Sequence, residues 1–444
     1  MPKKSPAAKP PSAQLDSPPN VKLSPRGTTR VKSGHPWVYR SDTTSAEDIP
    51  PGALVRVLDP RGKFLGTALY SSSSQIAIRM IARDQITDLA SLVSDRIRAA
   101  LAYRQQFVAD TNAYRLVFSE ADFLPGLIID RYNDVLSLQI LTQAMDAEPI
   151  RGAIIQTLIA ALKEEINLAG IVERVDPRIR DLEQLPPRQS ALLWGKKSET
   201  IITMNAEAKG LSEKREPKAE KREPNSQSRE PRAESRAVRF HCHALEGQKT
   251  GAFLDQRENY AAATRYAHGR ALDVFCYQGG FALHLAPHCA SVTAVDSSRP
   301  ALEMADQNAA LNRELLNGKE IEWIEANAFD LLRDYAAAGH KYDTIVLDPP
   351  AFAKTKRDLH KALSGYKELN LRALKMLASG GILVTCSCSF HVSPADFLGV
   401  VADAARDAHK SLRLLENRGA AKDHPNVLTI PEAAYLKCLI LVAP

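Results

Sequence analysis

The sequence predicts an α/β protein of three domains, the last of which is a Rossmann-like, mostly parallel sheet. Three observations support this fold class. After Gly247, short apolar segments alternate with amphipathic ones, which is typical of a doubly wound sheet with helices on both faces. Before that point, residues 21–88 show short apolar runs broken by turn residues, and residues 89–195 mix helical and strand patterns. A length of 444 residues also fits two or three domains of roughly 100 to 200 residues each.

We expect residues 21–88 to form a small β-rich domain, residues 89–195 a central α/β domain, and residues 196–444 the sheet domain. Residues 1–20 hold six prolines and no apolar period, so we expect a tail without regular structure. Residues 207–236 repeat Arg-Glu-Pro every seven residues, and the proline inside each repeat excludes a coiled coil. We interpret this segment as a solvated insertion that lengthens a hairpin turn. The alternative is that its basic residues tether RNA.

Local patterns predict the individual elements. In the β-rich domain we expect a turn at Asp59–Gly62 between two strands. In the central domain we expect helices at 88–108 and 149–164 and a hairpin turn at Asn133–Asp134. The segments that flank the insertion are expected to pair as a hairpin. The strands expected in the seven-stranded sheet are 271–276, 291–296, 321–326, 342–348 and 380–389, followed by a pair near 412–417 and 435–443.

Composition restricts the class of protein. With 44% hydrophobic and 25% charged residues, the chain has the composition of a globular protein. Its net charge of +6 permits an anionic partner without identifying one. The six cysteines lack the spacing of a disulfide framework, and no segment has about 18 uninterrupted apolar residues, so we expect a cytoplasmic protein with reduced thiols and no membrane partner. We expect no metal site, because His241 and His243 would share one face of a strand while Cys242 faces away.

Polar residues follow successive strands of the predicted sheet, where open α/β sheets bind their ligands. The second strand ends in Asp296, where a carboxylate can accept hydrogen bonds from ribose hydroxyls, and Asn327 after the third suits the edge of an adenine. The GxGxxG spacing that cradles a pyrophosphate is absent, which favours S-adenosylmethionine over a dinucleotide. Taken alone, the Gly-Gly turn after the first strand fits tight helix packing equally well. The candidate cofactor residues at these strand ends are Asp273, Phe275, Tyr277, Gly279, Asp296, Ser297, Asn327 and Ala328.

Two further strand ends carry candidate chemistry. The fourth strand runs into Asp348, followed by Pro349 and Pro350, which stiffen the chain so that the carboxylate can be held against a flat base. The fifth strand ends near Cys388, a thiol that we expect beside Asp348. Methylation at carbon 5 of a pyrimidine needs both groups, because that carbon becomes nucleophilic only after a thiolate adds at carbon 6. Taken alone, either motif also fits a structural role, as a strand-ending turn or a buried cysteine.

In this reaction Cys388 supplies the thiolate, and Asp348, which also borders the cofactor, protonates or hydrogen-bonds N3 of the base during the addition. Pro349, Pro350 and Phe352 are expected to contact the substrate. The sequence does not identify the base that removes the proton from carbon 5. Because carbon 6 is shielded in a stacked helix, the target must be flipped out or single-stranded.

These residues resemble those of the PUA-domain ribosomal RNA 5-methylcytosine methyltransferases, from about Val21 onward. The motifs that carry the resemblance are His35-Pro36-Trp37-Val38-Tyr39, Gly62–Gly66, Asp122–Arg131, Gln248–Arg257, Asp423-His424-Pro425 and Tyr435-Leu436-Lys437. The resemblance implies a class I methyltransferase fold, S-adenosylmethionine as cofactor, and Cys388 as nucleophile with Asp348 beside it. It also implies RNA of the large ribosomal subunit, the 23S rRNA, as partner. A homodimer is an open alternative.

The segment Gln248–Arg257 resembles the one that opens the family's methyltransferase domain, so we expect Gln256 to contact the cofactor and Lys249 and Arg257 to contact the substrate. The chain departs from the family in the Arg-Glu-Pro insertion and in Cys386, which stands where an aromatic residue is common. Two alternative functions remain. One is methylation of an exocyclic amine or a guanine nitrogen, with Cys388 serving only in packing. The other is a non-catalytic RNA-binding assembly factor that keeps a vestigial cofactor fold.

Overall fold

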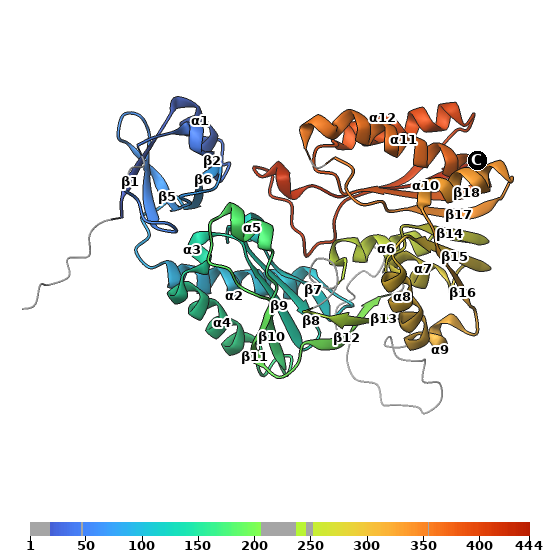
Figure 1. Ribbon diagram of the computed structural model, residues 1–444, viewed down its shortest axis with the longest axis horizontal. Coiled ribbons are helices and arrows are strands. Elements are labelled where there is room, and N and C mark those ends of the chain that lie inside the picture. The colour runs from blue at the N-terminus through green and yellow to red at the C-terminus, as the bar shows by residue number, and fades with distance from the viewer. Residues whose placement is uncertain (1–17, 46–47, 206–236, 246–251, 354) are drawn as a thin grey trace, which may run out of the picture.

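The computed structural model describes residues 18–45, 48–205, 237–245, 252–353 and 355–444 (Figure 1). Its elements form an N-terminal sheet domain, a central α/β domain and a C-terminal sheet domain with helices on both faces (Figure 1). The predicted fold class is confirmed. The expected insertion and most of the expected N-terminal tail lie outside the described residues. No helix in the described part of the chain is long and apolar enough to cross a membrane.

The N-terminal domain is built on a six-stranded sheet in the order β2-β6-β5-β4-β1-β3. Its elements are β1 (Asn20–Leu23), α1 (Pro25–Lys32), β2 (Trp37–Tyr39), β3 (Thr43–Ser45), β4 (Leu54–Leu58), β5 (Phe64–Tyr70) and β6 (Ile76–Ala82). The predicted turn between β4 and β5 is confirmed, and the Asp59 carboxylate closes it by accepting hydrogen bonds from the N–H groups of Arg61 and Lys63. Helix α1 was not predicted because it is mostly polar; it begins at Ser24, whose hydroxyl accepts from the N–H of Gly27.

The central domain is a five-stranded sheet in the order β11-β10-β9-β8-β7. Its elements are α2 (Leu89–Phe107), β7 (Ala113–Phe118), β8 (Leu127–Tyr132), β9 (Val135–Ile140), α3 (Gln143–Asp146), α4 (Glu148–Leu162), β10 (Gly170–Glu173), α5 (Pro177–Leu182) and β11 (Ala191–Gly195). The two helices predicted here are confirmed as α2 and α4, and they bury their apolar side chains in one cluster with the sheet. The predicted hairpin turn is also confirmed, with Asn133 at a φ of 53° between β8 and β9.

The C-terminal domain is a seven-stranded sheet in the order β16-β15-β14-β17-β18-β20-β19, in which β20 alone runs antiparallel to the other six strands. The strands are β14 (Arg270–Val274), β15 (Ser291–Asp296), β16 (Ile321–Glu325), β17 (Tyr342–Leu347), β18 (Leu377–Ser387), β19 (Arg413–Arg418) and β20 (Lys437–Ala443). The helices are α6 (Arg257–Thr264), α7 (Gly280–Leu285), α8 (Arg299–Leu311), α9 (Arg313–Leu316), α10 (Ala328–Ala337), α11 (Leu359–Met376) and α12 (Pro394–Asp407).

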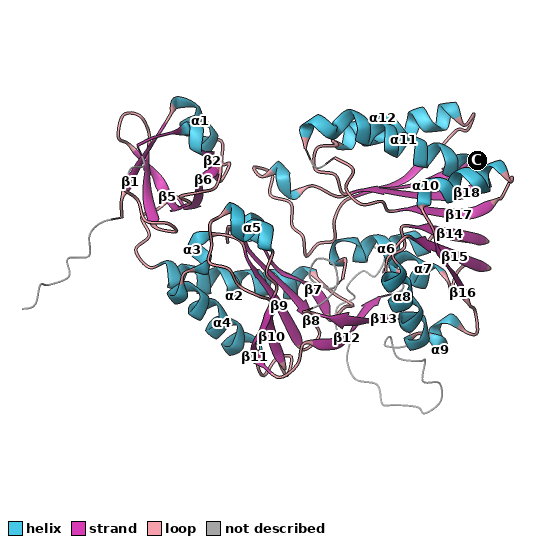
Figure 2. Cartoon of the chain, viewed as in Figure 1, coloured by secondary structure: helices cyan, strands magenta, loops and turns pink. Residues whose placement is uncertain are grey.

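Helices cover both faces of this sheet, as the alternating pattern predicted (Figure 2). Helices α10, α11 and α12 form one buried cluster with the strands, whereas α6, α7 and α8 form another with the opposite face. The strand order reverses beside β14, which has β15 on one side and β17 on the other. In open sheets of this kind, such a reversal leaves a crevice at the carboxyl ends of the strands.

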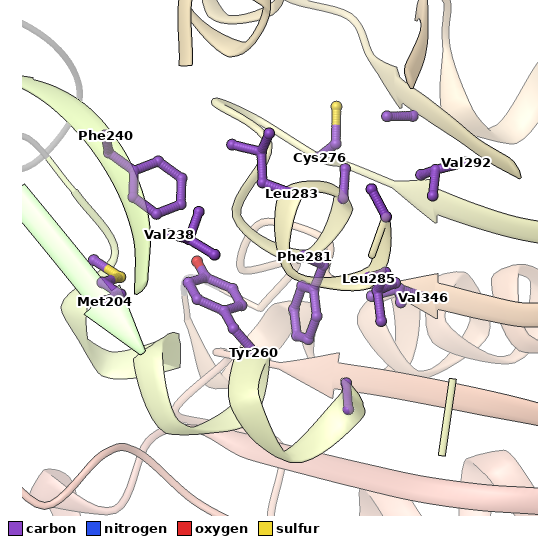
Figure 3. Close-up of a cluster of buried hydrophobic side chains, with 14 of the residues drawn as sticks. Met204, Val238, Phe240, Tyr260, Cys276, Phe281, Leu283, Leu285, Val292 and Val346 are labelled. Carbon is purple, nitrogen blue, oxygen red and sulfur yellow. The ribbon is translucent and has the colours of Figure 1, made fainter. Parts of the chain in front are cut away.

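A hairpin of β12 (Glu199–Asn205) and β13 (Ala237–His243) joins the central and C-terminal domains. The predicted pairing of these two segments is confirmed over all seven residues. Figure 3 shows Met204, Val238 and Phe240 of the hairpin packed toward Tyr260 of α6 and Phe281 of α7. On the central side, the backbone N–H of Thr203 donates to Asn112 at 2.8 Å. The hairpin is therefore part of the core that supports the C-terminal sheet.

A buried carboxylate, Asp423, also connects the central and C-terminal domains. Its carbonyl oxygen accepts from Arg104 of α2, which is itself fully buried, at 2.8 Å. Its carboxylate accepts from the N–H of Arg115 on β7 at 2.8 Å and from Arg257 of α6 at 3.2 Å. Burial alone would raise the pKa of Asp423, but His424, Arg257 and the Arg115 N–H outweigh burial and hold that pKa well below its ordinary value.

We predict that Asp423→Ala lowers the free energy of unfolding by about 3–5 kcal/mol, because it leaves the buried Arg257 without its main partner. Denaturant titration followed by circular dichroism measures the change. The matched control is Asp403→Ala, which removes a surface ion pair with Arg406 and should cost under about 1 kcal/mol. Because the folded pKa of Asp423 is lowered, its contribution is complete above about pH 4 and declines as the pH falls further. Equal effects of the two substitutions would contradict this role for Asp423.

Candidate active site

A cavity of about 440 Å³ lies at the carboxyl ends of β14, β15, β17 and β18, beside the reversal in strand order. Its volume falls within the roughly 300–1,000 Å³ typical of small-molecule sites. Segments from four strand ends meet there, together with the segment before α6 and the hairpin. The residues predicted for the site that line this cavity are Gln256, Phe275, Tyr277, Asp296, Ser297, Asp348, Pro349, Pro350 and Cys388.

One half of the cavity combines a carboxylate with aromatic rings. Asp296 is half-buried, and its two oxygens accept from the N–H groups of Tyr277 and Ser298, each at 2.9 Å. A carboxylate has about four acceptor positions, so both oxygens can still accept from hydroxyl groups in the cavity. Phe275 and Tyr277 have φ values of 68° and 50°, which bulky residues rarely adopt outside functional sites. This half fits the ribose, adenine and sulfonium of S-adenosylmethionine.

The turn after β14 packs closely against α6 and a buried carboxyl group. Gly279 has a φ of 83°, and a Cβ atom on Gly280 would lie 2.6 Å from the ring of Tyr260. Asp273 is fully buried under this turn, where one carboxyl oxygen accepts from the N–H of Ala282 at 2.9 Å. Burial raises the pKa of Asp273 to about 8. Asp273 and Gly279 therefore shape the turn, whereas the cavity wall itself is formed by their neighbours.

The other half of the cavity holds Cys388, just beyond the end of β18. Its neighbours Ser387 and Ser389 are fully buried, and their hydroxyls lie 3.0 and 2.9 Å from the hydroxyl of Tyr366 on α11. The sulfur of Cys388 lies 3.8 Å from the carbonyl oxygen of Pro349. The thiol is thus held at the cavity wall by both of its neighbours and lies against the Asp-Pro-Pro segment.

The structure distinguishes the two cysteines near this strand end. Cys386 is fully buried, and burial together with the adjacent Cys438 raises its pKa well above that of an ordinary thiol. Cys388 is partly exposed and lines the cavity. A thiolate, which is the reactive form of cysteine, is therefore disfavoured at Cys386. Of these two thiols, Cys388 is the one that a substrate in the cavity can reach.

A chain of polar side chains orients Asp348. The amide of Gln256 donates to Asp348 at 2.9 Å, and its own oxygen accepts from Asn259 at 2.7 Å. Asn259 in turn accepts from the guanidinium of Arg418 at 2.9 Å. Gln256, expected to contact the cofactor, lines the cavity and holds one oxygen of Asp348 in place.

Three more residues predicted for the site, besides Asp273 and Gly279, lie outside the cavity wall. Asn327 caps α10, where its side-chain oxygen accepts from two N–H groups of the first helical turn. Ala328 is buried in the same turn. The ring of Phe352 lies between those of Tyr366 and Phe329, with centroid distances of 4.8 and 6.0 Å. Their cofactor and substrate contacts stay predictions.

Arg257 has different contacts from those predicted. Its guanidinium is buried and lies 3.2 Å from Asp423 and 3.5 Å from Glu258, so it serves as a structural ion pair at the start of α6. The expectation of a substrate contact rests on the family resemblance of the Gln248–Arg257 segment, whereas the buried Asp423 that neutralises the charge of Arg257 is remote in sequence. Lys249 lies outside the described residues.

The cavity also contains residues that were not assigned to the site. Asp255 and Leu436 line it, and Asp255 accepts a hydrogen bond from the hydroxyl of Tyr435. Lys437 lies directly behind this wall. The only signal for these C-terminal residues was the motif Tyr435-Leu436-Lys437, which indicated a resemblance without indicating a position in the fold.

We predict that Gly280→Ala destabilises the fold by about 1–3 kcal/mol and weakens binding of S-adenosylmethionine, because the new methyl group meets the buried ring of Tyr260. Thermal unfolding and calorimetric titration measure the two effects. The matched control is Gly399→Ala in α12, where a Cβ atom meets nothing within 4 Å. That substitution should be neutral or should stabilise by up to about 1 kcal/mol. If both variants have the same stability and the same affinity for S-adenosylmethionine, the close packing of Gly280 against Tyr260 contributes to neither property.

Two family models match the chain. A PUA-like domain matches residues 21–83, and an S-adenosylmethionine-dependent methyltransferase matches residues 232–442. Among curated relatives, ribosomal RNA large subunit methyltransferase I of Tolumonas auensis is 37% identical over 418 residues, which are 92% of this chain and 95% of the relative. The protein of the same name from Photobacterium profundum is 35% identical over 415 residues with the same coverage.

Solved structures share the fold. A protein described as an S-adenosylmethionine-dependent methyltransferase from Streptococcus mutans matches with a TM-score of 0.74 at 18% identity, covering 96% of this chain and 100% of its own. A methyltransferase solved in complex with SAH matches with the same TM-score and coverage at 17% identity. The C-terminal domain is thus an S-adenosylmethionine-dependent methyltransferase domain. Because the identity to the curated relatives extends over nine-tenths of the sequence, the chain belongs to the ribosomal RNA large subunit methyltransferase I family.

Proposed function

We propose that this chain methylates carbon 5 of a cytosine in large-subunit ribosomal RNA, with Cys388 as a covalent nucleophile. The names of the curated relatives support ribosomal RNA as the substrate. The observation that carries the proposed chemistry is that a partly exposed thiol, Cys388, shares one cavity with Asp348 and with the cofactor half around Asp296. Methylation of an amine or of a ring nitrogen needs no thiol at that position, whereas methylation of carbon 5 does.

The proposed reaction begins when the Cys388 thiolate adds to carbon 6 of the cytosine, forming a carbon–sulfur bond and making carbon 5 nucleophilic. Asp348, as a protonated carboxyl group, donates its proton to N3 and so neutralises the negative charge that the addition develops there, while the Gln256 amide holds one of its oxygens. When bound, S-adenosylmethionine supplies the methyl group that carbon 5 takes up. A base then takes the carbon 5 proton, the electron pair of that bond restores the carbon 5–carbon 6 double bond, and the carbon–sulfur bond breaks so that Cys388 leaves again as the thiolate. N3 returns its proton to Asp348.

The remaining assignments follow from the same cavity. Asp296 accepts hydrogen bonds from the ribose, and Phe275 and Tyr277 contact the adenine and the sulfonium. The PUA-like and central domains contact RNA phosphates, which contribute affinity and position the target base. A thiolate mechanism fits the cytoplasmic location expected from the sequence, where thiols stay reduced. The domain limits 21–88, 89–195 and 196–444 and a homodimer stay predictions.

We predict that Asp296→Ala weakens binding of S-adenosylmethionine by roughly 10- to 150-fold, because hydrogen bonds to a charged group contribute about 1.5–3 kcal/mol. Isothermal titration calorimetry measures the dissociation constant. The matched control is Asp306→Ala, which removes an exposed carboxylate on α8 and should leave the affinity unchanged. An unchanged affinity in the Asp296 variant would remove this carboxylate from the cofactor site.

We predict that Cys388→Ala abolishes formation of 5-methylcytosine while S-adenosylmethionine still binds. Nucleoside mass spectrometry of unmodified ribosomal RNA, incubated with the enzyme and methyl-labelled S-adenosylmethionine, identifies the product. The matched control is Cys386→Ala, which changes a buried thiol two residues away and should keep the activity. Label in another nucleoside, or full activity of the Cys388 variant, would contradict the covalent mechanism.

A further inference from the structure

A buried lysine, Lys437, lies beside Cys388 and has no role in the mechanism above. Only 4% of Lys437 is exposed, which is rare for a lysine. It begins β20, the antiparallel strand that returns along β18. Its backbone pairs with Ser387, on one side of Cys388, and its ammonium donates to the carbonyl oxygen of Ser389, on the other side, at 2.7 Å. Lys437 therefore spans the short segment that carries the thiol.

The hydrogen bonds of Lys437 favour its charged form. Besides Ser389, the ammonium donates to the carbonyl oxygen of Tyr435 at 2.8 Å. Carbonyl oxygens only accept hydrogen bonds, and an ammonium carries three protons, so one proton remains for a third acceptor. Burial lowers the pKa of Lys437 to about 8, and the negative charge of a Cys388 thiolate acts in the opposite direction.

Other ionisable groups around the Cys388 thiol are neutral or, when ionised, negatively charged. Tyr366 and Tyr435 both face Cys388, and burial raises their pKa values, so they remain neutral at physiological pH. Asp348 and Asp255 line the same cavity and, when ionised, oppose a negative charge on the sulfur. A thiolate at this position consequently needs a cation close by. Lys437 is a cation hydrogen-bonded to the residue after Cys388, and a negative charge on the Cys388 sulfur raises the pKa of Lys437.

We propose that the Lys437 ammonium pairs with the Cys388 thiolate and keeps the nucleophile ionised before RNA binds. Lys437 acts through Cys388 and does not itself touch the reacting carbon, so it is a positioning residue. The two carbonyl hydrogen bonds hold its ammonium against the segment that carries the sulfur, and the third proton is left for the thiolate. A cation next to a cysteine is an established way to lower the pKa of a thiol. This inference rests on the proposed function only in assigning a purpose to the thiolate.

The test measures ionisation of the thiol directly. Full-length protein without RNA reacts with iodoacetamide over a range of pH, and peptide mass spectrometry follows alkylation at Cys388. In the unchanged protein the pH midpoint of Cys388 alkylation should lie clearly below about 8.5, the pKa of an ordinary cysteine thiol. Lys437→Met should raise the midpoint by about one pH unit or more, whereas Lys437→Arg, which keeps a cation, should restore most of the shift. A midpoint at or above 8.5 in the unchanged protein would overturn the proposal without any variant.

The matched control is Lys410→Met. Lys410 donates to the carbonyl oxygen of Leu377 at 2.7 Å, at the opposite end of β18, and burial lowers its pKa as well. This variant should leave the Cys388 midpoint unchanged. An equal midpoint in folded Lys437→Met and unchanged protein would also overturn the pairing.

The outcome is separable from that of the proposed function. If Cys388→Ala keeps methylation while Lys437→Met shifts the midpoint, the ion pair stands and the covalent mechanism fails. If Cys388→Ala abolishes methylation while Lys437→Met leaves the pH midpoint of Cys388 alkylation unchanged, the covalent mechanism stands and the role of Lys437 fails.

Discussion

The arrangement of the site depends on the parallel register of β14, β17 and β18. Val274 pairs with Leu347, and Leu347 pairs with Thr385, so the three strands end at the same edge of the sheet. Asp348 follows its strand by one residue and Cys388 follows the paired Thr385 by three. A slip of one residue would turn each side chain to the opposite face. The buried clusters on both faces fix the register and thereby bring the carboxylate and the thiol together.

The antiparallel strand β20 brings further residues to the cavity that the parallel strands do not provide. Strand β20 returns along β18 and brings Leu436 to the cavity and Lys437 behind the thiol. The segment before β20 is anchored to the central domain by Asp423 and contacts the N-terminal domain, where His35 lies 3.2 Å from Glu432. The segment that leads into β20, and thus to Leu436 at the cavity wall, is therefore in contact with both the central and the N-terminal domain.

Much of this architecture follows from local sequence. The alternation of apolar strands and amphipathic helices predicted the sheet, and the residues after each strand predicted Asp296, Asp348 and Cys388 at the cavity. These predictions worked because parallel strands share an edge, so a position relative to a strand end determines a position in space.

Other features depend on contacts between distant segments. Arg257 has the charge of a substrate contact, and only the fold reveals the buried Asp423 that neutralises it. Asn327 follows β16, and its position after the strand did not predict that it also caps the N-terminus of α10. Lys437 belongs to an antiparallel strand whose register across β18 no local pattern specifies. Sequence therefore predicts where strands end more readily than which distant side chain lies behind them.

The central claim is that Cys388 forms a bond to carbon 6 during catalysis. RNA containing 5-fluorocytidine tests it directly, because carbon 5 then carries no proton to lose and the carbon–sulfur bond cannot be broken by elimination. If Cys388 is the nucleophile, a covalent protein–RNA complex accumulates only with S-adenosylmethionine present, and peptide mass spectrometry maps it to Cys388. A complex mapped to another residue, or methylated RNA released without any covalent complex, would contradict it.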